Sequence, residues 1–547
     1  MNRAKFVALA APALLVACAG PQPAVPLYEG LGAYRRAATG CSEAAQRYLD
    51  QGLALYYGFN HDEAIRAFRQ AEELDPRCPM APWGAALSAG PNINNMEMDE
   101  AASEAAHAAA QRALALVDRA APAERAMIRA VAQRYAWPPP DDRRTLDEAY
   151  AAAMREAWHA HPDDPDVGSL YAESLMDLRP WDLWSADGVP RPETPEVIAT
   201  LDSVLARAPE HPGANHFYIH TMEASPNPER ALLIADRLGG LVPAAGHLVH
   251  MPSHIYVRTG RYDKVVTANQ DAIAADLRYL DVSGAGRGGF YSIYRAHNYH
   301  FLAYGAMFDG RRELAMQAAR DMVRELPLET VRAFPDFLDG FIATPVHVMV
   351  RFGLWQELLA EPPPPDDLVV TVAFRHYGRT VALSALGRVD EATAEFARLR
   401  AAFDAVPESR LIGNNAARTV LEIALPMAEG ELEYRRGNHE RAFALLRDAV
   451  RRDDALRYDE PWGWMQPVRH ALGALLLEQG RVADAEAVYR EDLFLHPGNG
   501  WALHGLAECQ RRAGNAVEAA ETQARFRAAW ARSDIVIAGS CYCRTRA

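Results

Sequence analysis

The chain has 547 residues, of which 50% are hydrophobic and 24% charged, and its formal net charge is -15 at pH 7. A chain of this length and hydrophobicity can bury a large core. The acidic balance, and the absence of any basic cluster with interleaved aromatic residues, speak against nucleic acid as a partner. Alanine, leucine, arginine and glutamate dominate and apolar residues recur at helical spacing, so we expect an almost wholly α-helical protein.

Residues 1–17 have the pattern of a bacterial export signal. Arg3 and Lys5 supply a positive start, and an apolar stretch too short to span a bilayer follows them. The cleavage region, Leu-Val-Ala before Cys18, resembles the lipobox of bacterial lipoproteins. That resemblance implies that Cys18 is acylated and becomes the first residue of the mature chain. The alternative is an ordinary secretory signal with an incidental cysteine.

The export signal also predicts a location. We expect a protein of the bacterial cell envelope that is lipid-anchored, faces the periplasm and belongs to the outer membrane. The sequence after the signal has no stretch that is long and apolar enough to be a transmembrane helix. The membrane is therefore expected to be a partner only through the lipid anchor.

The start of the mature chain is predicted to be a tether over residues 18–40, because prolines cluster there. N-terminal helical repeats are expected over residues 41–135. Cys41 precedes the first helix of the opening repeat and Cys78 follows its second, so both lie at the same end of one helical hairpin. Because an exported protein meets an oxidising compartment, we predict a disulfide between these two cysteines.

The rest of the chain divides by composition and repeat phase. Its predicted parts are central repeats with a histidine-lined groove over 136–360, a proline-rich joint over 361–368, C-terminal helical repeats over 369–535 and a cysteine-containing tail over 536–547. Either Cys541 or Cys543 could reach Cys509, whereas direct pairing across one intervening residue is expected to be strained. The pairing of these three cysteines stays open.

A repeat period of 34 residues can be fixed without using any histidine, because small residues and prolines mark it. In residues 466–499 the marks are Gly473, Gly480, Ala485 and Pro497. Residues 45–78 carry Gly52, Ala64 and Pro76 at the places of Gly473, Ala485 and Pro497. Each unit is predicted to form a helix, a short turn near its fifteenth place and a second helix. This period is typical of stacked helical hairpins.

The repeats also resemble a known family. The strings "GRYDKVVTANQDAI", "GNHERAFALLRDAV", "GRVADAEAVYREDLFLHP" and "FNHDEAIRAFRQAEELDP" are similar to tetratricopeptide repeats, and the resemblance covers most of residues 41–533. It implies an all-α solenoid of helical hairpins wound into a right-handed superhelix, with the first helix of each hairpin on the concave surface. Longer strings such as "GHLVHMPSHIY" resemble a group of bacterial tetratricopeptide lipoproteins, a resemblance that brings no activity with it.

A ladder of histidines follows the repeat period. His216 and His250 lie 34 residues apart, and so do His220 and His254. The other histidines in the same phase are His247, His297, His300 and His347. They fall at the second, fifth and ninth places of their units, which lie on one stripe of the first helix. Because first helices face inward in the tetratricopeptide family, we expect these side chains to line the groove.

The ladder predicts a metal site. Two histidines one helical turn apart suit a single divalent ion, and the pair on the next repeat lies roughly 10 Å away, within reach of inward side chains. The predicted metal ligands are His216, His220, Glu223, His250, His254, His300, His347 and Glu173. Imidazole with carboxylate and no nearby cysteine suits zinc, iron, copper or manganese. The remaining His247 and His297 are candidates for catalytic proton transfer.

The sequence leaves several functions open. The first hypothesis is a metal-dependent hydrolase or oxidoreductase that acts on an unidentified small molecule. The second is a non-catalytic scaffold that holds an envelope protein in its groove. The third is metal storage or sensing without turnover. In the structural alternative to all three, the histidines are hydrogen-bonded or solvated residues of the repeats that bind no ion.

Overall fold

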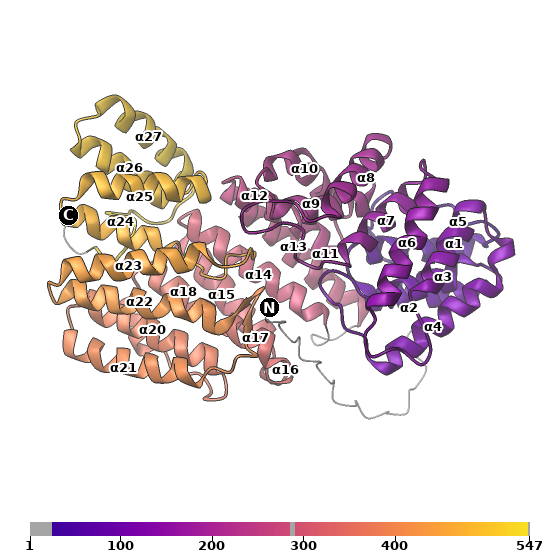
Figure 1. Cartoon of the computed structure of the whole chain (residues 1–547), viewed down its shortest axis with the longest axis horizontal. Helices are drawn as coiled ribbons and strands as arrows, with labels where there is room; N and C mark the ends of the chain where they lie inside the picture. The colour runs from indigo at the N-terminus through magenta and orange to yellow at the C-terminus, as the bar shows by residue number, and fades with distance from the viewer. Residues whose placement is uncertain (1–24, 285–289, 545–547) are drawn as a thin grey trace. The chain divides into compact units, whose positions relative to one another are not determined.

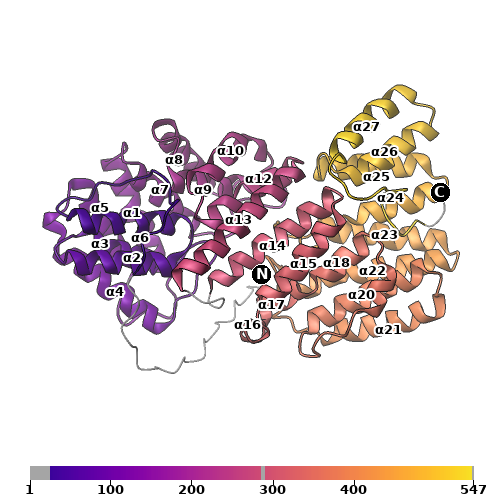
Figure 2. The same cartoon turned by 180° about the vertical axis from the view of Figure 1, so that it is seen from behind.

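The computed structural model describes residues 25–284 and 290–544 (Figures 1 and 2). These residues are almost wholly helical, and the strand pair they contain is β1 (Leu411–Ile412) antiparallel to β2 (Asn415–Ala416). The predicted all-α fold of helical repeats is thereby confirmed. The predicted signal peptide and Cys18 lie outside the described residues. Within them, no helix combines the length and the hydropathy that crossing a bilayer requires.

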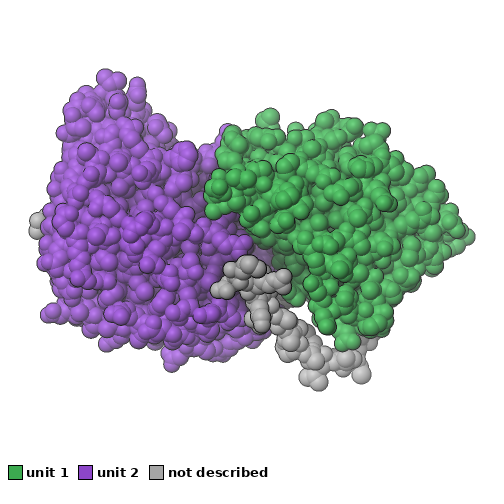
Figure 3. Space-filling model, in the orientation of Figure 1, with its two compact units in different colours: residues 1–255, 271–286 green, residues 256–270, 287–547 purple. Residues whose placement is uncertain are grey.

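The chain forms two compact units, which Figure 3 colours separately. Unit 1 comprises residues 1–255 and 271–286, and unit 2 comprises residues 256–270 and 287–547. The predicted central segment is therefore divided between them rather than forming one part. Its histidines up to His254 belong to unit 1, and the later ones belong to unit 2. A sequence period identifies the face of a helix, but it does not tell which unit the helix joins.

Unit 1 is built from α-helices and two short 3-10 helices. They are α1 (Glu43–Tyr57), α2 (His61–Leu74), α3 (Met80–Ser88), α4 (Glu100–Ala115), η1 (Val117–Arg119), α5 (Pro122–Gln133), α6 (Arg144–Ala160), α7 (Pro165–Met176), α8 (Thr194–Arg207), α9 (Pro212–Glu223), η2 (Pro228–Ala231), α10 (Leu232–Leu241) and α11 (Gly246–His250). The helices α12 (Pro252–Arg258) and α13 (Tyr262–Ser283) each contribute residues to both units.

Unit 2 continues the helical repeats. Its helices are α14 (Tyr291–Phe308), α15 (Arg312–Glu325), α16 (Leu328–Ala333), α17 (Pro335–Ile342), α18 (Thr344–Arg351), α19 (Trp355–Ala360), α20 (Val369–Ala385), α21 (Val389–Ala405), α22 (Ala417–Arg435), α23 (His439–Asp454), α24 (Val468–Glu478), α25 (Val482–Leu495), α26 (Gly500–Arg512) and α27 (Ala516–Ala529). Their apolar faces form a core that includes Phe374, Trp464 and Leu475.

The helices of a hairpin are joined by tight turns with one left-handed residue. Between α24 and α25, Gly480 has a φ of 73°, and the next amide donates to the carbonyl five residues before it. Glycine adopts this conformation without steric cost. The turn between α1 and α2 makes the same hydrogen bond, but its left-handed residue is Phe59, with a φ of 54°.

Residues 25–40, here called the N-terminal strap, differ from the predicted tether. They have no helix, but they pack along unit 1 through specific contacts. The hydroxyl of Tyr28 donates to Glu63 over 2.7 Å, and Arg36 forms an ion pair with buried Asp166 over 2.6 Å. The proline content of the segment therefore accompanies an extended, docked chain rather than a free linker.

The cysteines pair within each unit. Cys41 and Cys78 form a disulfide with their Cα atoms 4.6 Å apart, in the pairing that the hairpin geometry predicts. Cys541 pairs directly with Cys543, and Cys509 is free and buried. The sequence argument expected strain in that pairing. The Cα atoms of the direct pair lie 5.1 Å apart.

Candidate metal centre in unit 1

Five histidines of unit 1, here called the imidazole cluster, form a closed ring of side chains. Neighbouring ring centroids are separated by 4.8 Å (His216 and His220), 5.7 Å (His220 and His254), 4.8 Å (His254 and His250), 5.9 Å (His250 and His247) and 4.9 Å (His247 and His216). Each of the five residues is at most 4% exposed. The five ladder histidines that belong to unit 1 therefore lie together.

Helix α9 supplies two of the five rings and the carboxylate of Glu223. All twelve residues of α9 are buried, so its polar side chains must find partners inside the protein. His216, His220 and Glu223 follow one another at spacings of four and three, which places them on one stripe of the helix. The N-cap residue before α9 is His211, whose ring accepts a hydrogen bond from the backbone amide of Ala214 in the first turn.

The other three rings come from α11 and α12. His247 and His250 lie on α11, and His254 lies on α12, which begins at Pro252 because proline interrupts the helical hydrogen-bond ladder. The start of α11 is closely packed: a Cβ atom on Gly246 would lie 2.0 Å from a carboxylate oxygen of Asp276. Glycine is therefore required next to His247.

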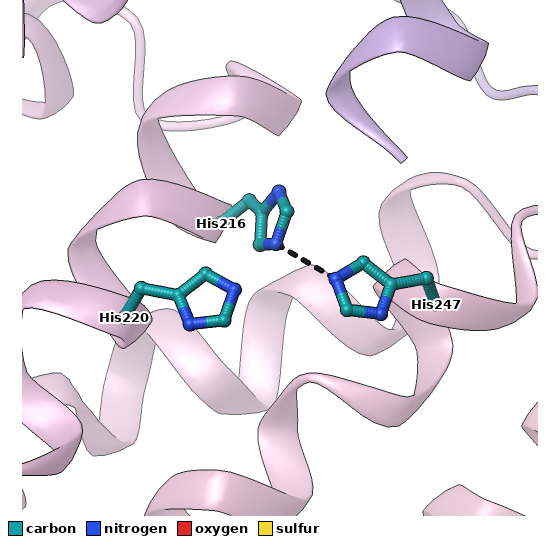
Figure 4. A group of neighbouring side chains, drawn as sticks. All are labelled: His216, His220 and His247. Atoms are coloured by element: carbon teal, nitrogen blue, oxygen red, sulfur yellow. Dashed lines mark hydrogen bonds between the residues drawn. The ribbon is translucent and has the colours of Figure 1, made fainter. Parts of the chain in front are cut away.

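Hydrogen bonding fixes which nitrogen of His216 carries the proton. Its Nδ1 lies 2.7 Å from the carbonyl oxygen of Tyr57, at the end of α1 where helix carbonyls have no helical donor. Nδ1 must donate to that oxygen, so the lone pair is on Nε2. This Nε2 lies 3.1 Å from Nε2 of His247, with His220 beside them (Figure 4). The ligand atoms of these three histidines all lie within 4.8 Å of one another.

Glu223 orients two further rings. Its Oε1 accepts a hydrogen bond from Nδ1 of His220 over 3.1 Å, and its Oε2 lies 2.8 Å from Nδ1 of His254. Burial acts to raise the pKa of Glu223, but His220 and His254 outweigh it and hold that pKa below its ordinary value. A carboxylate in this position selects the tautomer with a proton on Nδ1. The Nε2 atoms of both rings are then available as ligands.

The protonation state of the cluster suits metal binding. The pKa values of His216 and His247 lie well below the ordinary value for histidine, first because burial disfavours the charged ring and then because neighbouring imidazoles repel a second positive charge. Both rings are therefore neutral at pH 7. Neutral imidazole is the form that coordinates metal ions.

The nitrogen spacings can be compared with those of metal ligands. With metal–nitrogen bonds of about 2.0–2.1 Å, two ligands lie about 3.3 Å apart at a tetrahedral angle and about 2.9 Å apart at a right angle. The pair His216 and His247 is separated by 3.1 Å, and the pair His250 and His254 by 2.8 Å, between their Nε2 atoms. Each pair needs to move by only a few tenths of an ångström to coordinate a shared ion.

Two aromatic rings held by unusual backbone lie against the cluster. Among the described residues, Phe59 and Trp181 are the non-glycine residues with positive φ, at 54° and 57°. The ring of Phe59 lies 4.5 Å from that of His216 and 5.3 Å from that of His247, and the ring of Trp181 lies 5.7 Å from that of His220. Such backbone costs on the order of 1–3 kcal/mol per residue and tends to occur at functional sites. The sequence alone did not reveal Phe59.

Glu173, a predicted ligand, makes a different contact. It lies on α7 in unit 1 and accepts a hydrogen bond from the hydroxyl of Tyr56. Burial raises its pKa to about 7. Its neighbour one turn along, Asp177, forms a buried ion pair with Arg134 over 2.7 Å. Glu173 and Asp177 thus contact Tyr56 and Arg134. Their helical spacing placed both carboxylates on one face of α7, but it did not predict these partners.

Three predicted histidines belong to unit 2. His297 and His300 lie on α14, and His347 lies on α18. Nε2 of His300 lies 3.0 Å from the sulfur of Met465, and the ring of His347 meets that of Trp464 edge-on at 5.9 Å. Burial lowers the pKa of His300 to about 3 and that of His347 to about 4. Among the described residues, neither His300 nor His347 joins a group of three ligand atoms.

Comparison with known proteins does not assign a family. No family model matches the chain, and no curated protein matches it. Among solved structures, the human IFIT1 dimer with m7Gppp-AAAA is similar over 89% of this chain and 91% of that chain, at 11% identity and a TM-score of 0.32. A monomeric IFIT1 mutant with m7Gppp-AAAA is similar over 89% and 96%, at 12% identity and a TM-score of 0.34. Similarity at this level carries no argument about function.

Proposed function

We propose that this chain is a metal-binding helical-repeat protein in which His216, His220 and His247 hold a divalent transition metal ion. The observation that supports it is the meeting of three buried imidazoles whose ligand atoms lie within 4.8 Å of one another. Nitrogen ligands without a thiolate suit zinc, iron, copper or manganese. In this proposal His247 is a ligand rather than a proton carrier, because its Nε2 lies 3.1 Å from that of His216.

The surrounding residues have separate roles in this proposal. The carbonyl of Tyr57 and the carboxylate of Glu223 hold rings in the tautomer that presents Nε2. Phe59 and Trp181 exclude water from the cluster. A bound ion with an open coordination position would supply a Lewis acid that activates water or binds dioxygen. The corresponding enzyme classes are metal-dependent hydrolase and oxidoreductase.

The proposed location is the periplasmic side of the bacterial cell envelope, with a lipid anchor on Cys18. The export pattern of the first 17 residues supports it. The pairing of Cys41 with Cys78 in unit 1, and of Cys541 with Cys543 in unit 2, also fits an oxidising compartment. Detection of acylated Cys18 by mass spectrometry of the mature protein would test the anchor.

Removal of the Nε2 ligands tests the metal site. We expect His216→Asn combined with His247→Asn to lose at least nine-tenths of the bound metal, measured by elemental analysis of the purified, untagged protein. Asparagine can place an amide nitrogen near the position of Nδ1, so the contact of residue 216 with the Tyr57 carbonyl is preserved. Nε2 itself is removed.

The control is a variant with asparagine at two histidines outside the cluster, His159 and His439. The wild-type metal content should persist in it. Circular dichroism of both variants should match that of the wild type. Unchanged metal content in the variant of the cluster would contradict the proposed site, as would the absence of metal from wild-type protein that has been incubated with zinc, iron, copper and manganese in turn.

A further inference from the structure

We infer that the imidazole cluster is a two-ion centre, in which His250 and His254 hold a second divalent metal ion beside the first. This inference rests on the proposed function, since it divides the same cluster into two sets of ligands. His216, His220 and His247 form one set, and the pair on α11 and α12 forms the other.

The division follows from the nitrogen positions. Nε2 of His250 lies 2.8 Å from Nε2 of His254, which is the spacing of two ligands at about a right angle on one ion. Ring spacing alone does not divide the cluster, since His220 and His247 of the first set have centroids 6.1 Å apart and the two sets approach to 5.7 Å. The ligand atoms of the first set form a group of their own within 4.8 Å. Five imidazoles also exceed what one ion in a protein usually takes from histidine.

Glu223 links the two sets. One of its oxygens contacts His220 of the first set, and the other contacts His254 of the second. A single carboxylate therefore orients one ligand of each ion through Nδ1 and leaves both Nε2 atoms for coordination. In a carboxylate–histidine–metal triad, a carboxylate holds Nδ1–H of a histidine whose Nε2 binds the metal. Glu223 would serve as the carboxylate of two such triads, one through His220 and one through His254.

The charges of the cluster favour a second cation. The carboxylate of Glu223 is 2% exposed and lies between His220 and His254. A buried negative charge is costly unless a nearby positive charge compensates it. Two divalent ions provide that charge on both sides of the carboxylate.

The competing explanation is an ordinary hydrogen bond between His250 and His254, for which 2.8 Å is also a suitable distance. In that case one ring donates Nε2–H to the other, and no second ion binds. The two explanations differ in metal stoichiometry and in the magnetic behaviour of a paramagnetic ion, and both can be measured on the full-length protein.

The test uses zinc and Cu²⁺ as probes. We expect the wild type to retain two equivalents of zinc after gel filtration, and His250→Asn combined with His254→Asn to retain one. With two equivalents of Cu²⁺, the wild type should give an electron paramagnetic resonance signal weaker than its copper content, because two ions held by neighbouring imidazoles of one cluster lie close enough to couple. The variant of the second set, loaded with one equivalent, should give the full signal.

Each outcome decides one of the two proposals. One equivalent of zinc in the wild type, with uncoupled copper, overturns the two-ion centre and leaves the proposed function intact. Retention of two equivalents by the variant of the second set also overturns it. No retained metal in the wild type overturns the proposed function itself. The wild-type stoichiometry and the copper signal decide the question even where the double variant does not fold.

Discussion

At the residue scale, the clearest mark of a functional site is backbone conformation. Most turns of the repeats have glycine at the left-handed position, as at Gly480, but the first hairpin has Phe59 there. The strain at Phe59 and at Trp181 is tolerated because the surrounding structure holds both rings against histidines. In the proposed site, rings that shield the cluster from water would strengthen the attraction between an ion and its ligands.

Removing the Trp181 ring tests this role. We expect Trp181→Gly to speed the loss of metal to an external chelator at least tenfold, because His220 loses the ring that lies against it. Glycine relieves the positive φ at this position, so the free energy of unfolding should fall little despite the smaller side chain. Stopped-flow transfer of zinc to a chromophoric chelator measures the rate. Trp181→Phe retains an aromatic ring, and equal rates in the two variants would contradict the role.

Much of the candidate centre could be predicted from the sequence. The 34-residue period placed His216, His220, His250 and His254 in one phase, because a repeat fixes which helical face a residue occupies. The repeat period does not determine the backbone conformation of a turn, so the sequence did not predict the positive φ of Phe59 or its contact with the cluster. It also does not say which compact unit a helix joins.

At the scale of elements, the N-terminal strap shows how an extended segment can be fixed without secondary structure. Arg36 contacts both Asp164 and Asp166, over 2.8 and 2.6 Å. Burial favours the neutral form of Asp166, but Arg36 and His211 hold its pKa well below its ordinary value. The strap therefore supplies a charge that the interior of unit 1 needs. Composition could not predict this, since the prolines of the segment suit a linker equally well.

Adjacent arginines of the strap provide a matched test. We expect Arg36→Ala to lower the free energy of unfolding by about 3 kcal/mol, because it leaves the buried carboxylate of Asp166 without its cation. Arg35 is 61% exposed at its side chain, and Arg35→Ala should cost less than about 1 kcal/mol. Urea denaturation followed by circular dichroism measures both values. Equal losses in the two variants would show that the strap is not held by this ion pair.

At the scale of the whole molecule, all the ligands proposed for the metal belong to unit 1, although the repeats continue through both units. A ligand that binds only the folded form of one unit stabilises that unit by mass action. The solenoid pattern, which the sequence predicted well, is common to both units. The two units differ in the side chains of particular helices, since α9, α11 and α12 carry the histidines of the imidazole cluster.

Hydrogen exchange can locate this stabilisation. We expect zinc to slow exchange of the backbone amides of α9 and α11 by at least tenfold, because opening these helices releases the ion. The amides of α20 to α25 in unit 2 should exchange at unchanged rates. Mass spectrometry of peptic fragments with and without zinc measures both. An equal effect on both units would contradict a site confined to unit 1.

With the proposed lipid on Cys18, the strap would limit how far unit 1 can lie from a membrane. It is fixed from Val25 onward, where the carbonyl of that residue accepts a hydrogen bond from Tyr48. Only seven peptide links separate Val25 from Cys18, and a fully extended chain of that length reaches about 25 Å. If the lipid is attached at Cys18, unit 1 cannot sample the width of the periplasm. Ions and small molecules would then have to reach the imidazole cluster in the narrow layer next to the bilayer surface.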